Sequence, residues 1–175
     1  MASAPHLARL HIQDTVARYN IAGDRRDLDA FVGTFTDDAI YESAVFACKG
    51  TEEIWTYLAA AWRVAPGTPQ PRVRRHHITT TQIDIESQSH ARGRIYYLMI
   101  TDLGLDHCGF YVDRYRRIGA GWRIAHRQVW MDWSLPESLY VPAASKALVA
   151  NVGAAGPPGG ELHGADPLPD PRLSP

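Results

Sequence analysis

Two adjacent histidines, His76 and His77, lie near the start of the segment RRHHITTTQIDI, whose later residues alternate as in a β-strand. Side chains of a strand point alternately to the two faces of a sheet, so we expect one imidazole to face the protein interior. Because the ordinary pKa of imidazole lies close to neutral pH, an inward histidine can act as a general base. The spacing alone does not decide which histidine is inward, since one β-bulge would exchange their faces.

Such a base works best with a carboxylate next to the ring nitrogen that does not take the substrate proton. The carboxylate fixes the tautomer and favours the imidazolium that forms when the proton is taken. Asp24 follows the first predicted helix directly after Gly23 and could supply that carboxylate. The periodicity alone favours a simpler alternative, in which His76 makes a hydrogen bond inside the core and Asp24 caps the turn GDRRD.

Three helices are predicted in the first part of the chain. Residues 5–22 form the first, which Gly23 ends and whose apolar side chains recur at helical spacing: Ala8, Ile12, Val16 and Tyr19. The second helix is capped by Asp27, and its buried stripe consists of Leu28, Phe31 and Phe35. A short strand at residues 40–46 follows, and Thr51 caps the third helix.

The rest of the domain is predicted to be strands separated by connections of hairpin length. These strands cover residues 73–86, 90–102, 107–118 and 121–133. Helices followed by a β-meander indicate an α+β fold, in which the helices cover one face of a strongly curved antiparallel sheet. We expect a cone-shaped internal cavity between the two layers, where ligands bind by default.

Length and composition indicate one soluble domain over residues 5–150. Residues 151–175 contain five glycines and six prolines, so we expect this tail to be disordered. Residues 134–152 could cover the cavity mouth or pack on a neighbouring subunit. The 18 Lys and Arg are balanced by 19 Asp and Glu, which argues against a nucleic-acid partner. No apolar run could span a membrane and no signal peptide opens the chain, so we expect a cytoplasmic protein.

The cysteines and most histidines give no sign of a metal centre. Cys48 and Cys108 fit no metal-ligand spacing and are interpreted as packed or free thiols. No His, Asp and Glu cluster has metal spacing, so we predict no metal and no cofactor. The remaining histidines are given no role, because they fall on the first helix, in turns or the tail, or on the opposite sheet face: His6, His11, His90, His107, His163 and His126.

Five segments of the chain together resemble the SnoaL-like domain of the nuclear-transport-factor-2-like (cystatin-like) superfamily, over about residues 7–133. They are RYNIAGDRRDLDAFVGTFTDDAIYE, KGTEEI, RHHITTTQIDI, GFYVDRY and GWRIAHRQVWMDW. The resemblance implies a cone-shaped α+β fold. It is closest to the branch that contains scytalone dehydratase, bile-acid 7α-dehydratase and hexachlorocyclohexane dehydrochlorinase.

That branch keeps an aspartate after the first helix and a histidine at the start of the first long strand. The resemblance places them at Asp24 and His76, because Thr80, Ile83 and Ile85 fit the family pattern better from His76 than from His77. It gives Tyr19 the role of donating a hydrogen bond to a substrate oxygen, with a core tyrosine as the alternative. The expected function is a cofactor-independent lyase that eliminates water from a small, hydrophobic, cyclic substrate, acting as a homo-oligomeric trimer or dimer.

Several strand residues are expected to surround that site. Tyr97, Met99 and Tyr111 are predicted to line the pocket and bind substrate, although ordinary core packing would also explain them. Asp113 and Arg127 occupy positions where the family has the same residue types, and a buried pair on neighbouring strands must compensate each other's charge. We therefore predict a structural ion pair, with substrate contact by Arg127 as the lesser alternative.

Two other functional classes stay open. One is a non-catalytic binding or scaffold subunit, in which side chains would fill the cone. The other is an isomerase or cyclase that uses the same pocket and base. Ser43 stands where the ketosteroid-isomerase branch has its catalytic aspartate, which argues against that isomerisation.

Overall fold

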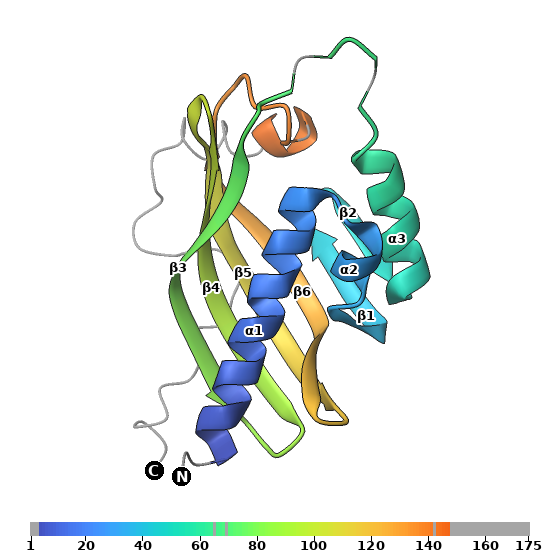
Figure 1. Cartoon of the computed structure of the whole chain (residues 1–175), viewed down its shortest axis with the longest axis vertical. Helices are drawn as coiled ribbons and strands as arrows, with labels where there is room; N and C mark the ends of the chain where they lie inside the picture. The colour runs from blue at the N-terminus through green and yellow to red at the C-terminus, as the bar shows by residue number, and fades with distance from the viewer. Residues whose placement is uncertain (1–3, 65, 69, 142, 148–175) are drawn as a thin grey trace.

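The computed structural model describes residues 4–64, 66–68, 70–141 and 143–147 (Figure 1). Its helices are α1 (Ala4–Arg25), α2 (Leu28–Val32) and α3 (Gly50–Ala61), with a helical turn at 143–147. Its strands are β1 (Phe35–Ser43), β2 (Phe46–Lys49), β3 (Arg74–Ile85), β4 (His90–Thr101), β5 (Gly104–Ile118) and β6 (Gly121–Ser134). The predicted tail at 151–175 lies outside the described residues.

The six strands form one sheet in the order β2-β1-β6-β5-β4-β3, which curls around α1 (Figure 1). This confirms the predicted α+β class and the curved sheet with helices on one face. The expectation of a purely antiparallel sheet is wrong at one pair, because β1 runs parallel to β6. Hairpins make strands antiparallel only when they are neighbours in sequence, and β1 meets β6 across most of the chain.

Helix α1 lies in the hollow of the sheet, and the predicted apolar stripe is its buried face: Ala8, Ile12, Val16 and Tyr19. The helix does not end at Gly23 but continues to Arg25. Its end is set by Arg26, whose φ of 55° turns the chain into the left-handed region. The amide of Asp27 then donates to the carbonyl of Ala22, 3.0 Å away, as in a helix C-cap. Asp24 therefore belongs to the last turn of α1.

The segment between α1 and α3 is more extended than predicted. Asp27 caps α2 as expected, accepting a hydrogen bond from the amide of Ala30 at 3.0 Å. Phe35, predicted on the stripe of this helix, instead begins β1 and is fully buried there. The predicted strand at 40–46 is part of a hairpin of β1 and β2. Lys49, not Thr51, occupies the cap position of α3.

Aromatic rings fill the space between α1, α2 and the sheet. Tyr19 packs on Phe31 at 4.3 Å between ring centroids, and Phe35 lies 5.4 Å from Tyr41. This cluster anchors the C-terminal half of α1 against β1 and β5, which fixes the position of Asp24 one turn further along.

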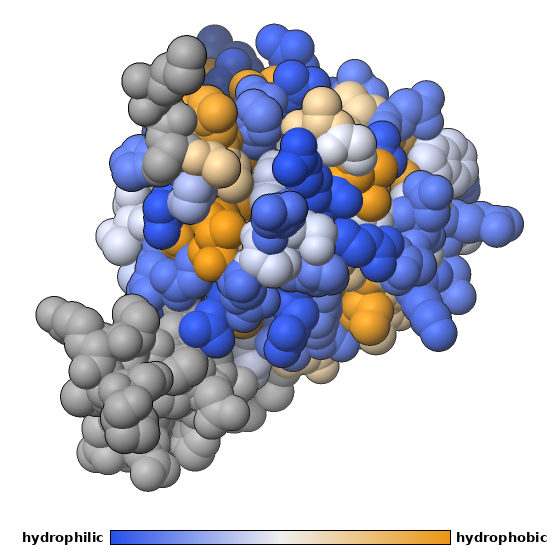
Figure 2. Space-filling view, turned by 90° about the horizontal axis from the view of Figure 1, so that it is seen from below, coloured by the Kyte–Doolittle hydropathy of each residue, from blue (hydrophilic) through white to orange (hydrophobic). Residues whose placement is uncertain are grey.

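The lower end of the molecule presents a mainly hydrophilic surface with smaller hydrophobic areas among it (Figure 2). Among the helices that the structure describes, none is long and apolar enough to cross a membrane.

Candidate active site

The end of α1 is bound to the start of β3 through Asp24. One carboxylate oxygen of Asp24 lies 2.7 Å from Nδ1 of His76, and both oxygens lie 3.2 Å from the backbone amide nitrogen of His76. Arg74 donates from Nε to the backbone carbonyl of Asp24 at 2.7 Å. The structure thus brings together the two residues that the sequence paired from distant segments. It also places His76 on the inner face of the sheet, whereas His77 is exposed.

This geometry defines which nitrogen of His76 can react. The anionic carboxylate of Asp24 accepts a hydrogen bond from Nδ1–H, so Nε2 carries the free lone pair. The side chain of His76 keeps 22% of its surface exposed, against 7% for that of Asp24. The imidazole is therefore held at one nitrogen and accessible at its other edge, as a general base requires.

Tyr97, Met99 and Tyr111 all lie on the inner face beside His76, each at most 2% exposed. The ring of Tyr97 lies 6.0 Å from that of His76 and stacks on Tyr111 at 4.6 Å. The Tyr97 hydroxyl donates to the carbonyl of Trp130 at 3.2 Å, and burial raises the pKa of this phenol. These two tyrosines and the methionine form a mainly aromatic wall next to the histidine.

Tyr19 lies deeper in this row of rings. Its centroid is 5.7 Å from that of Tyr111, so Tyr111 and Tyr97 follow one another between Tyr19 and His76. The Tyr19 hydroxyl lies 3.2 Å from that of Tyr41. Burial raises the pKa of Tyr19 despite the opposing positive charge of Arg127, so the phenol is a hydrogen-bond donor rather than a base.

Asp113 and Arg127 form the predicted ion pair. Nε and Nη2 of Arg127 donate to the two carboxylate oxygens at 2.8 and 2.6 Å, and both side chains are fully buried. The guanidinium carbon lies 4.0 Å from the ring centre of Tyr19 and 4.1 Å from that of Tyr111. Burial alone would lower the pKa of Arg127, but Asp113 holds it well above its ordinary value. Within the described residues, Nη1 makes no hydrogen bond.

The structure adds a second histidine that the sequence analysis placed in a turn. β5 begins at Gly104, so His107 lies within the strand and points inward, only 9% exposed. Its Nδ1 lies 2.7 Å from the carboxylate of Asp106, and its ring centroid is 6.0 Å from that of His76. The assignment of His107 to a turn was wrong because the strand begins at Gly104, three residues before its predicted start.

A β-bulge at Asp106 explains how its carboxylate can contact the ring of His107, the next residue in the chain. Met99 pairs with His107 and Ile100 with Leu105, so Asp106 is an extra residue without a partner on β4. Such a residue bends the strand and reorients its side chain. Only the alternation in HCGFYVD could have signalled the inward histidine, because it places His107 on the same face as Tyr111 and Asp113.

The segment that follows β6 closes over Asp106. The amide of Leu135 donates to the Asp106 carbonyl at 2.8 Å, and the hydroxyl of Ser138 donates to its carboxylate at 2.6 Å. Lys146 then binds the carbonyl of Ser138 at 2.5 Å. Ser138 is 5% exposed, so this segment is packed onto the site end of the sheet.

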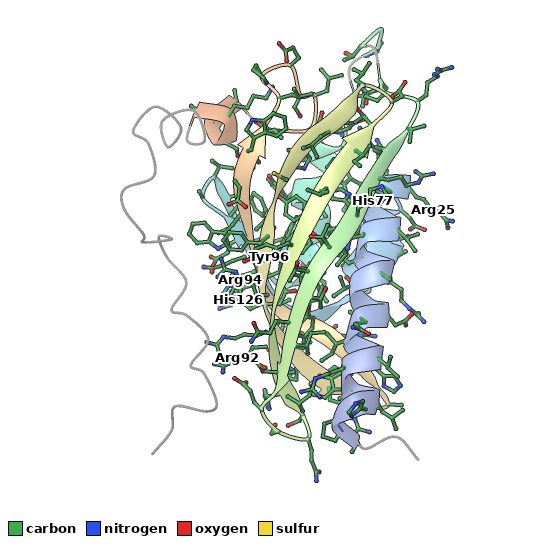
Figure 3. The ribbon with its side chains drawn as sticks, turned by 90° about the vertical axis from the view of Figure 1, so that its left-hand side faces the viewer. Arg25, His77, Arg92, Arg94, Tyr96 and His126 are labelled. Carbon is green, nitrogen blue, oxygen red and sulfur yellow. The ribbon has the colours of Figure 1, made fainter. Side chains whose placement is uncertain are left out.

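The other titratable residues lie elsewhere. His126 binds Glu42 on the outer face at 2.9 Å, as its predicted orientation requires, and lowers the pKa of that carboxyl. Figure 3 shows His126, Arg94 and Tyr96 on the side of the sheet opposite α1. No group of three potential ligands is positioned to hold a metal among the described residues. An open groove beside α1, lined by Arg18 and Trp122 among others, includes neither Asp24 nor His76.

Comparison with known proteins supports the same assignment of fold. The sequence profile of the SnoaL-like domain matches residues 5–128. No curated protein matches the chain.

Solved structures with the same fold include three from Novosphingobium. A protein described as a candidate scytalone dehydratase from N. aromaticivorans is 17% identical, covering 81% of this chain and 94% of its own, with a TM-score of 0.68. A hexachlorocyclohexane dehydrochlorinase from N. barchaimii is 20% identical, with coverages of 79% and 97% and a TM-score of 0.62. The β subunit of a candidate aromatic-ring-hydroxylating dioxygenase from N. aromaticivorans is 20% identical, with coverages of 79% and 98% and a TM-score of 0.66.

Proposed function

Because the chain belongs to the SnoaL-like domain family, we propose that it is a cofactor-independent lyase that eliminates water from a small, hydrophobic, cyclic substrate. The observation that carries the proposal is the 2.7 Å contact between the Asp24 carboxylate and Nδ1 of His76. A carboxylate at this position orients the imidazole and stabilises the imidazolium that proton abstraction creates.

In the proposed reaction, Nε2 of His76 takes a proton from a carbon next to a carbonyl group. The electrons of the broken C–H bond form a C=C bond, and the adjacent C–O bond breaks so that hydroxide leaves and is protonated to water. A positioned base of this kind contributes about 10²–10⁴-fold to the rate. The aromatic wall of Tyr97, Met99 and Tyr111 suits an apolar ring, which explains the proposed substrate class.

In the proposed reaction, the Tyr19 hydroxyl donates a hydrogen bond to the substrate carbonyl or to the leaving hydroxyl. In the Tyr19–Tyr41 pair one hydroxyl donates to the other, so one phenolic hydrogen is left for a third oxygen. Arg127 is held by Asp113 and its guanidinium lies against the rings of Tyr19 and Tyr111. Its first role is therefore to hold the aromatic wall in position. Its free Nη1 is the atom through which it would contact substrate.

The test is a screen for elimination products, followed by variants of the pair. The probes are 3-hydroxycyclohexanones and 3-hydroxy-1-tetralones, followed by product absorbance, and hexachlorocyclohexane isomers, followed by chloride release. His76→Asn and Asp24→Asn should each lower kcat on an accepted probe by about 100-fold or more. His77→Asn is the matched control, because this exposed histidine should be dispensable. Near-normal turnover by His76→Asn would disprove the mechanism.

A non-catalytic subunit is the second candidate, favoured by exposed apolar residues on the outer sheet face. Tyr96, Trp133 and Leu105 are 37%, 40% and 39% exposed there, although they are large and apolar. An accessory subunit would copurify with a larger partner, whereas we expect the enzyme to form a homo-oligomer, a trimer or dimer, through this face.

The free thiols of Cys48 and Cys108 agree with the expected cytoplasmic location.

A further inference from the structure

Two arginine-rich segments of the chain meet where α1 and α3 end and β3 begins, in the upper half of the molecule in Figure 1. Residues 24–27 and 62–76 contain six arginines and two aspartates. Both aspartates are engaged, because Asp24 binds His76 and Asp27 caps α2. The region therefore has an excess of positive charge, carried by Arg25, Arg26, Arg63, Arg72, Arg74 and Arg75.

Arg26 and Arg74 are partly buried, whereas the other four arginines are exposed. Arg74 lies two residues before His76 on the same face of β3, and it pairs with the buried Thr101 of β4. Its guanidinium carbon lies 5.9 Å from the ring centre of Tyr140. Arg74 therefore points toward the same interior as the candidate base, below the segment that follows β6.

Arg26 belongs to the same small region. Burial lowers the pKa of Arg26, the charge of Arg74 lowers it further, and Tyr140 acts in the opposite direction. The two guanidinium groups and the phenol are thus close enough to influence one another, although they come from three separate segments.

Neutral oxygen atoms are the hydrogen-bond partners of both guanidinium groups. Arg26 donates to the carbonyl of Trp62 at 2.9 Å and to Oε1 of Gln70 at 3.2 Å. Arg74 donates to the backbone carbonyl of Asp24 at 2.7 Å. Neither arginine forms an ion pair with a carboxylate of the described residues. The two positive charges repel each other, and an anion bound between them would relieve that repulsion.

Two further features indicate that these side chains serve a ligand. Arg26 has a φ of 55°, in the left-handed region that glycine adopts more easily, so an arginine here has a backbone cost that its side chain must offset. The hydroxyl oxygen of Tyr140 is buried and makes no hydrogen bond within the described part of the chain. A buried hydroxyl normally has a partner, so this one is available as a donor.

We propose that Arg26, Arg74 and Tyr140 bind an anionic group of the substrate, a carboxylate or a phosphate, beside the His76 base. Planar guanidinium groups donate paired hydrogen bonds to such oxygens, and the phenol donates one more. The identity of the ligand as the substrate rests on the proposed lyase function. Arg74 and His76 are two strand residues apart, about 7 Å. The substrate is then an apolar ring whose anionic group lies roughly that far from the carbon that loses its proton.

The anion site is tested first without turnover, by isothermal titration calorimetry with cyclohexanecarboxylate and with inorganic phosphate. The wild type should bind at least one of them, and the preferred anion distinguishes carboxylate from phosphate. Arg26→Gly and Arg74→Gln should each weaken this binding by about 10- to 100-fold, because a hydrogen bond to a charged group is lost. Arg75→Gln is the matched control, since it removes the same charge from an exposed side chain of β3.

The proposal is wrong if the wild type binds neither anion, or if Arg75→Gln weakens binding as much as the other two variants. Thermal melting checks that each variant is folded. Arg26→Gly should fold, because glycine suits the left-handed backbone at this position. Tyr140→Phe removes only the hydroxyl and replaces any arginine variant that does not fold; it should weaken binding by a smaller factor.

Activity then separates this inference from the lyase proposal. The two probes are 3-hydroxycyclohexanone and the same ring carrying a carboxylate. The wild type should prefer the carboxylate probe, with a KM about 10- to 100-fold lower, and Arg26→Gly should abolish that preference. Equal KM values of the wild type for both probes would refute the anionic substrate while elimination stands. Turnover by His76→Asn would instead overturn the lyase mechanism and leave the anion site in place.

Discussion

At the scale of single residues, the pair of Asp113 and Arg127 shows how charge is accommodated behind the aromatic wall. Arg127 donates two hydrogen bonds to the Asp113 carboxylate, and the Tyr115 hydroxyl donates a third at 2.5 Å. Both side chains of the ion pair are closed off from solvent. Removing one partner of such a pair leaves an uncompensated buried charge, which costs more than the pair itself contributes.

Asp113→Asn should therefore lower the free energy of unfolding by about 3–5 kcal/mol, as measured by urea denaturation. The control is Asp14→Asn, which breaks the exposed Asp14–Arg18 pair on α1 and should have little effect. A loss as small for Asp113→Asn as for Asp14→Asn would contradict the assignment of Arg127 as a buried cation held by this carboxylate. The double variant Asp113→Leu/Arg127→Met should recover much of the stability, because both charges are gone.

At the scale of elements, the close approach of β5 and β6 depends on Gly109. A Cβ atom at this position would lie 2.0 Å from the carbonyl oxygen of Trp130, the same oxygen that accepts the Tyr97 hydroxyl. The register between the two strands shifts at this point. A side chain here would therefore push β6 away and disturb the wall beside His76 at the same time.

Gly109→Ala should destabilise the protein by about 1–3 kcal/mol or more, the cost of overpacking, and weaken probe binding through Tyr97. Gly23→Ala is the matched control: its Cβ would meet only the Phe31 ring at an ordinary 3.5 Å, inside a helix where alanine is favoured. Thermal unfolding of the two variants checks this. Equal melting temperatures for both would mean that the strands can separate at Gly109 without cost.

At the scale of the whole molecule, the curled sheet has one face covered by α1 and an outer face that the helices leave open (Figure 3). On this outer face, the guanidinium carbon of Arg94 lies 4.0 Å from the ring centre of Phe110, whose ring is stacked on that of Trp130 with centroids 6.0 Å apart. Partly exposed apolar side chains surround it, as expected for a surface that meets another subunit.

The wild-type protein should therefore elute as a dimer or trimer in size-exclusion chromatography with light scattering. Introducing a charge with Trp133→Glu or Tyr96→Glu should shift it toward the monomer, since both side chains lie on this face. Leu7→Glu is the control, because Leu7 is an apolar residue on α1 that is at least as exposed as Trp133 and Tyr96. A monomeric wild type, or equal dissociation by Leu7→Glu, would contradict association through the outer face.

The sequence by itself determined the features that depend on local periodicity. The stripe of Ala8, Ile12, Val16 and Tyr19 predicted α1, and alternation predicted the four long strands to within a few residues. The inward orientation of His76 and its aspartate partner came from a family resemblance rather than from spacing. The buried charges at 113 and 127 were predictable because neither can be left alone in an apolar interior.

Only the tertiary structure decided the rest, because it depends on pairings between distant segments. Packing decides that β1 pairs in parallel with β6 and that Phe35 belongs to β1 instead of to α2. Packing also extends α1 to Arg25, so that Asp24 lies in its last turn. The bulge at Asp106 has no signature in the sequence, since one unpaired residue leaves the composition of a strand unchanged. That bulge lets the Asp106 carboxylate contact both His107 and Ser138, and so this second carboxylate–imidazole pair became apparent only from the folded chain.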